Sequence, residues 1–213
     1  MSLKAILSEI EEELKERKEV KDELYDAMRK ATRLSKQAIF LVHKRKFDKA
    51  KKMLQETKKL FGKRDEVPVA HKELVYAGIV DAAFQEYTEA HIFLKLVRDS
   101  EFVSPQKIGV PSTSYILGLA DVVGELRRKA LDSLREGDVK DAGKNLEAME
   151  LVYNELTGMD EAMHSVSELR RKIDIARRII ESTRGDVTIE VRRSSLERSI
   201  KGLEETLKTK KKK

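Results

Sequence analysis

The sequence contains no cysteine and no tryptophan, and only three prolines among its 213 residues. The lack of cysteine excludes a disulfide framework, a thiolate zinc site and a cysteine nucleophile. Because helix breakers are few and aromatic residues make up only 5%, the composition disfavours β-sandwiches, barrels and collagen-like chains. No apolar run approaches the roughly 18 residues of a membrane span, and the first 17 residues lack the apolar block of a signal peptide. We therefore expect a soluble, cytoplasmic protein without a membrane partner.

Charged residues are abundant, at 38% of the chain, and their distribution is uneven. The net charge is +6, but five lysines lie in the last six residues, and the rest of the chain has 39 Lys and Arg against 38 Asp and Glu. Residues 43–64 contain ten Lys and Arg against two acids, a balance that attracts polyanions. A solvated helix face is the simpler interpretation of these lysines, and we expect a frayed, soluble end at residues 208–213.

Apolar residues recur at three- and four-residue steps along most of the chain, which predicts an all-α fold. We expect a single domain over residues 1–207, followed by the basic tail 208–213. Residues 103–114, which hold two of the three prolines, are the clearest loop. The seven expected helices cover residues 3–46, 48–62, 69–100, 114–136, 138–158, 164–184, and 187 to the tail.

Common motifs of catalysis and cofactor binding are missing from the sequence. There is no GxGxxG, neither Gly-Lys pair belongs to a phosphate-binding loop, and no serine lies in a nucleophile elbow. The four histidines are scattered and include no HExxH, so we expect each to be at the surface or locally bonded; they are His43, His71, His91 and His164.

Two pairs of carboxylates lie at helical spacing near apolar stripes. Glu86 falls among the apolar positions of its helix, and Glu89 lies one turn away on the same side. Asp121 and Glu125 are four residues apart beside a second stripe. An ionised carboxylate on a packing face is costly, and two neighbouring ones repel each other, unless a cation is bound.

Two glycines flank the second pair, at positions 118 and 124. A glycine within a helix costs about 1 kcal/mol relative to alanine, so this pair suggests close approach by another backbone or by a ligand. Two antiparallel helices can present four carboxylates to one cavity, and all-oxygen ligation favours magnesium or manganese over zinc. The alternative is that salt bridges neutralise the acids, through Arg127, Arg128, Lys95 and Arg98.

The same segments resemble the translin family, and within it the translin-associated factor X branch. The matching motifs are QEYTEA at 85–90, YILGLADVVGELRR at 115–128 and SKQAIFLVHK at 35–44, with a fainter match over 172–185. The resemblance implies a seven-helix fold, a closed, hollow, octamer-like shell and nucleic-acid binding inside it. In the factor X branch it also implies a magnesium-dependent ribonuclease whose catalytic acids fall on Glu86, Glu89 and Asp121, with Glu125 as a further acid.

The resulting hypothesis is a metal-dependent endoribonuclease that cleaves short RNA, single-stranded or duplex, as a homo-oligomer. Magnesium, or manganese, held by the four carboxylates would activate a water and stabilise charge on the phosphorane. Arg128 is a candidate to hold the scissile phosphate, and further RNA backbone contacts are expected from Arg33, Lys36 and Lys44.

Two other functions stay open from the sequence. An all-α, magnesium-dependent nucleoside triphosphate pyrophosphohydrolase also gathers carboxylates from neighbouring helices, and residues 9–24 are rich in acids. A non-catalytic nucleic-acid-binding shell would bind RNA without turnover.

Overall fold

The computed structural model describes residues 2–210, and every regular element in that part of the chain is helical. The all-α prediction is therefore confirmed. The chain divides into two compact units, Met1–Leu119 and Ala120–Lys213. Within the described residues, no helix combines the length and apolarity that crossing a bilayer requires.

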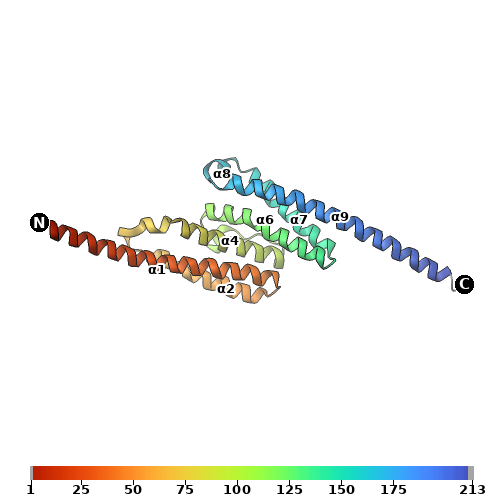
Figure 1. The fold of residues 1–213 in the computed structure, drawn as a ribbon, viewed down its shortest axis with the longest axis horizontal. Coiled ribbons are helices and arrows are strands. Elements are labelled where there is room, and N and C mark those ends of the chain that lie inside the picture. The colour runs from red at the N-terminus through yellow and green to blue at the C-terminus, as the bar shows by residue number, and fades with distance from the viewer. Residues whose placement is uncertain (1, 211–213) are drawn as a thin grey trace. The chain divides into compact units, whose positions relative to one another are not determined.

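The first unit is built around α1, α2 and α4, which pack against one another (Figure 1). Apolar residues at helical spacing on these three helices form its core, and the largest fully buried side chains there are Leu24, Met28, Val42, Leu54, Val80, Tyr87, Ile92 and Phe93. Its elements are α1 (Leu3–His43), α2 (Phe47–Leu60), α3 (Gly62–Asp65), the 3-10 helix η1 (Val69–Tyr76), α4 (Gly78–Asp99), α5 (Pro105–Ile108) and the first residues of α6 (Ser112–Arg135).

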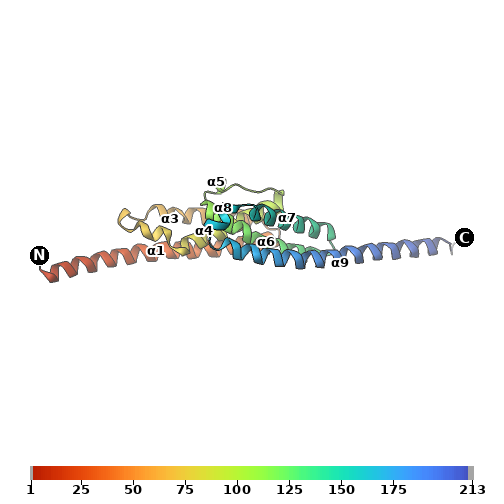
Figure 2. The ribbon, with the colours of Figure 1, turned by 90° about the horizontal axis from the view of Figure 1, so that it is seen from above.

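Helix α1 extends beyond the other helices of its unit (Figures 1 and 2). Its first half carries apolar side chains that remain exposed, from 39% for Ile6 to 71% for Leu3. From Leu24 onward most apolar residues of the same helix are buried against α2 and α4, with Phe40 as an exposed exception. One continuous helix therefore has a solvated first half and a packed second half.

The second unit contains the rest of α6, then α7 (Val139–Thr157), α8 (Asp160–Ser165) and α9 (Leu169–Lys210). The Asp138 side chain caps α7 by accepting from the backbone N–H of Asp141 at 2.9 Å. Helices α7 and α9 pack together. Helix α6 is tied to α9 by the Arg127 guanidinium, which donates to the carbonyl of Ile179 at 3.0 Å and to Thr183 Oγ1 at 2.7 Å.

The described residues form nine α-helices and one 3-10 helix where the sequence predicts seven helices. The additional α-helices are the short α3, α5 and α8, while two predicted helices, 164–184 and 187 to the tail, are joined in the single helix α9. The predicted helix 69–100 is also wrong at its start, because residues Val69–Tyr76 form the 3-10 helix, with His71 outside helical geometry at φ −123°. Regular α-helix begins only at Gly78. The 3-10 helix directly follows Pro68 and precedes the apolar stripe of α4.

The predicted break at Gly185 is wrong, since α9 runs unbroken through it. Glycine costs a helix about 1 kcal/mol, which favourable packing on both sides can offset. Thr183 and Val187 are both buried, so the packed face of α9 continues past the glycine. Helix α9 also includes Lys208 and Lys210 of the predicted frayed tail, whereas residues 211–213 lie outside the described residues. A single domain over residues 1–207 stays a prediction.

Two histidines that the sequence places at the surface or in local bonds are packed inside the first unit. His71 is buried, and the ring of His91 lies edge-on to Tyr87 with the ring centroids 4.5 Å apart. Burial lowers the pKa of His91 to about 4, with a further contribution from the nearby Lys58, and burial raises the pKa of Tyr87 to about 12. His164 is exposed and bonds locally to the carbonyl of Asp160, as expected.

The depressed pKa of His91 predicts that acid weakens the fold. Between about pH 6.5 and pH 4 the unfolded chain binds a proton at this site that the native chain does not, so the free energy of unfolding falls as pH falls. Between pH 7 and pH 5, we expect the free energy of unfolding to fall by about 2 kcal/mol more in the wild type than in His91→Gln. Urea denaturation of both proteins at the two pH values measures this difference, and equal losses would contradict the prediction.

Candidate acidic site on helices α4 and α6

The first acidic pair lies on α4, on a partly covered face. The Glu86 side chain is 23% exposed, and its Oε1 lies 3.2 Å from Nζ of Lys36 on α1. Glu89, one turn further along α4, is also only partly exposed. The structure therefore confirms that these two acids do not belong to a fully solvated helix face.

The start of α6 contacts α4 beside this pair. A Cβ atom on Gly118 would lie 2.6 Å from the carbonyl oxygen of Gln85 and 2.8 Å from Cβ of Thr88, closer than real side chains approach. Glycine is required there because the two helix backbones meet directly. The close approach expected at Gly118 is confirmed, and it lies against the turn of α4 that carries Glu86 and Glu89.

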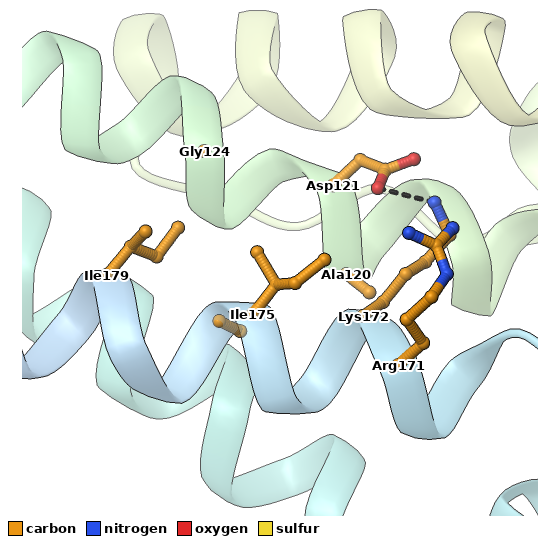
Figure 3. A pocket seen from close by; sticks show the side chains of 8 residues that line it. Ala120, Asp121, Gly124, Arg171, Lys172, Ile175 and Ile179 are labelled. Carbon is orange, nitrogen blue, oxygen red and sulfur yellow. Dashed lines mark hydrogen bonds and ion pairs between the residues drawn. The ribbon is translucent and has the colours of Figure 1, made fainter.

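The second acidic pair lies on the part of α6 that belongs to the second unit. The side chains of Asp121 and Glu125 are each about a quarter exposed. Asp121 Oδ1 accepts from Nζ of Lys172 on α9 at 2.6 Å (Figure 3). Lys172 itself is only 10% exposed. Glu125 lies 4.0 Å from the guanidinium of Arg128, one turn further along α6.

A pocket of about 160 Å³ opens beside Asp121. Figure 3 shows that Asp121 and Gly124 line it from α6, while Ile175 and Ile179 line it from α9. Among the described residues no neighbouring atom lies within 4 Å of a Cβ built on Gly124, so this glycine leaves space in the pocket wall rather than allowing a helix contact. The cavity has room for several water molecules. Its full lining is Ala120, Asp121, Gly124, Arg171, Lys172, Ile175, Ala176 and Ile179.

The basic residues that the sequence offers as neutralisers mostly bond elsewhere. Arg127 bonds to α9, and both Lys95 and Arg98 pair with Asp99, whereas Arg128 approaches Glu125. The close ion pairs with Glu86 and Asp121 come instead from Lys36 and Lys172.

Sequence reasoning missed Lys172 as a partner of the acids, although a signal exists. The lysine directly precedes the buried Ile173 and follows the buried Leu169 by three residues. It therefore stands at the edge of an apolar stripe, where a lysine needs an anionic partner.

The four residues that the sequence predicts to contact RNA are all exposed. Arg33 and Lys36 lie on its packed half, and Lys44 directly follows its last residue. The ammonium of Lys44 lies 5.8 Å from the ring centroid of Phe40, which is itself exposed. Arg128 on α6 is exposed as well. These positions leave the four cations accessible, and their contacts with RNA stay predictions.

The residues present suit a hard divalent cation. All four acids offer carboxylate oxygens, the ligands that magnesium and manganese prefer, and a lysine ammonium already lies beside one acid of each pair. Within the described part of the chain, no group of three or more histidine or acidic side chains is close enough to hold one metal ion. Each unit contributes one pair, so the four-carboxylate metal site stays a prediction.

The family model of the Translin family matches residues 19–182, and the chain belongs to this family. The resemblance inferred from residues 85–90 and 115–128 is therefore confirmed for the family, while the factor X branch stays a prediction. Among curated proteins, the chain is 33% identical over 127 residues to the uncharacterised protein MJ0175 of Methanocaldococcus jannaschii, a match covering 59% of this chain. The match spans 57% of the relative's length.

Solved structures with the same fold include a complex of AfC3PO with duplex RNA and a crystal structure of AfC3PO. Both AfC3PO chains are 33% identical to this chain, and each match covers 86% of it. The RNA complex has a TM-score of 0.72 over 95% of the AfC3PO chain, and the other structure has a TM-score of 0.74 over 96%. The crystal structure of apo-NeC3PO, at 24% identity and a TM-score of 0.73, covers 86% of this chain and 96% of that chain and supports the fold alone.

Proposed function

We propose that this chain is a cytoplasmic RNA-binding protein that assembles into a closed homo-oligomeric shell and cleaves short RNA with magnesium. Membership of the Translin family and similarity to AfC3PO, which has been solved with duplex RNA, support RNA as the ligand. The proposal of nuclease activity is supported mainly by one observation. Each unit holds a pair of partly buried carboxylates, and each pair contains an acid in an ion pair with a lysine.

In this proposal the metal is held by Glu86, Glu89, Asp121 and Glu125. When bound, magnesium would activate a water for attack and stabilise negative charge developing on the phosphate. Arg128 lies one turn from Glu125 and would hold the scissile phosphate by charge-assisted hydrogen bonds. The exposed Arg33, Lys36 and Lys44 on and beside α1 would bind the RNA backbone without reading its sequence.

Magnesium removal is expected to stop cleavage but not binding. Without the metal, the carboxylates provide no Lewis acid to activate a water or to stabilise charge on the phosphate. Contacts of lysine and arginine with the RNA backbone, in contrast, need no metal. Labelled short RNA, both single-stranded and duplex, is incubated with the protein in magnesium and in EDTA, and cleavage and binding are followed on gels. Binding should weaken steeply with salt.

The RNA assay, run beside an assay with nucleoside triphosphates and a measurement of the solution mass, separates the other two functions. RNA binding with no turnover in magnesium would indicate the non-catalytic shell. Release of pyrophosphate from nucleoside triphosphates without RNA cleavage would indicate the pyrophosphohydrolase. A monomeric mass in solution, both with and without RNA, would overturn the shell while leaving the metal site to be tested separately.

A further inference from the structure

Lys172 is a nearly buried cation whose partner is one of the proposed metal ligands. Its side chain is 10% exposed, and its Nζ lies 2.6 Å from Asp121 Oδ1. An ammonium largely removed from water is stable only when an anion neutralises it. In the absence of metal, Asp121 provides that anion.

The lysine and a metal ion compete for the same carboxylate. Two cations at one carboxylate repel each other strongly where water is scarce, so a metal that binds Asp121 leaves the Lys172 ammonium in need of another anion. We propose that Lys172 is a positioning residue that neutralises Asp121 before the metal binds and then turns to a phosphate of the RNA. This inference rests on the proposed function and adds a coupling between the metal and the RNA.

The pocket gives the lysine somewhere to turn. It opens directly beside the ion pair, and Gly124 contributes no side chain to its wall (Figure 3). Arg171 lines the same pocket, and its exposed guanidinium pairs with Glu168 at 3.4 Å. Once a metal takes Asp121, the Lys172 ammonium would favour an anionic group in this cavity, and an RNA phosphate has that charge.

A second buried pair in the same unit provides a comparison. Lys129 is 11% exposed and pairs with Asp141. Asp141 also accepts from Ser133 Oγ at 2.6 Å, so its carboxylate is held by a local network. Neither residue lines the pocket beside Asp121. Loss of Lys129 therefore reproduces the damage of removing a buried lysine without altering the proposed metal ligand.

The proposal predicts positive coupling between metal and RNA. Metal binding to the RNA-free protein must displace the ammonium, whereas bound RNA supplies the phosphate that receives it. RNA should therefore tighten metal binding, and by thermodynamic linkage metal should tighten RNA binding by the same factor.

The test measures Mn²⁺ affinity by paramagnetic resonance in the wild type and in Lys172→Met, Lys129→Met and Asp121→Asn. Without RNA, Lys172→Met should bind Mn²⁺ about tenfold more tightly than the wild type or better, because a repelling charge is gone. A 2′-O-methyl RNA, checked on a gel to remain intact during the measurement, should tighten Mn²⁺ binding several-fold in the wild type and not in Lys172→Met. Lys129→Met should match the wild type in both measurements.

Unchanged or weaker Mn²⁺ binding by Lys172→Met would overturn the inference. If that variant fails to fold, the measurement on the wild type still tests the coupling. A wild-type Mn²⁺ affinity that does not change when the RNA analogue is added would overturn it. The proposed metal site is judged separately, since it fails if Asp121→Asn keeps the wild-type Mn²⁺ affinity.

Discussion

Alanine at Glu89 or at Asp121 is expected to reduce the rate of RNA cleavage about a thousandfold or more, with RNA still bound. Each substitution removes a carboxylate that the proposal assigns to the metal, and the metal contributes several kcal/mol to transition-state stabilisation. The measurement is single-turnover cleavage of a labelled short RNA, with binding followed in parallel. Because Asp121→Ala also leaves Lys172 without this partner, its folding must be checked by circular dichroism.

The matched control is Glu16→Ala, which removes an exposed acid from the solvated half of α1. It should cleave like the wild type. Cleavage that survives at the wild-type rate in either Glu89→Ala or Asp121→Ala would rule out the carboxylate mechanism. Loss of RNA binding in Glu89→Ala would instead point to a structural role for that acid.

Gly118→Ala is expected to destabilise the first unit by about 1–3 kcal/mol, even though alanine favours helix by about 1 kcal/mol. The added methyl group would lie 2.6 Å from a backbone oxygen of α4, and backbone cannot rotate away as a long side chain can. Relief requires the two helices to move apart at Gln85, next to Glu86. Urea denaturation measures the loss, and cleavage should fall as well.

Gly124→Ala provides the control for this substitution, since it places the same methyl group on the same helix. Apart from its chain neighbours and the backbone of its own helix, no described atom lies within 4 Å of that added methyl, so helix propensity should raise stability by up to about 1 kcal/mol. The two denaturation midpoints should therefore shift in opposite directions. A shift of both variants in the same direction would contradict the close contact at Gly118.

Local spacing was sufficient to predict most of the long helices. The stripe that begins at Leu24 packs as its periodicity predicts, and α7 lies between its predicted boundaries, Asp138 and Gly158. The errors occur where tertiary packing outweighs a local signal. Gly185 lies within α9 because buried neighbours on both sides continue the packed face, and the 3-10 helix after Pro68 delays the start of α4 to Gly78.

The acidic site was predictable in part for the same reason. Helical spacing places Glu86 and Glu89 on one side of α4, and the cost of glycine in a helix indicates the close contact at Gly118. The position of Lys172 beside an apolar stripe indicates that it needs an anion, but not which one, because Lys172 is 51 residues from Asp121 and meets it only through the packing of α6 and α9. Which basic residue reaches which acid depends on helix packing that periodicity does not specify.

The solvated first half of α1 has a consequence for hydrogen exchange. A helix of this length has only marginal stability in water when nothing packs against it, whereas the residues from Leu24 onward share the stability of the whole unit. Amide protons should therefore exchange rapidly near Leu7 and slowly near Ala38, although both belong to one continuous helix. Slower exchange of the first turns, measured at the same pH and temperature, would indicate that something has covered the exposed leucines and isoleucines.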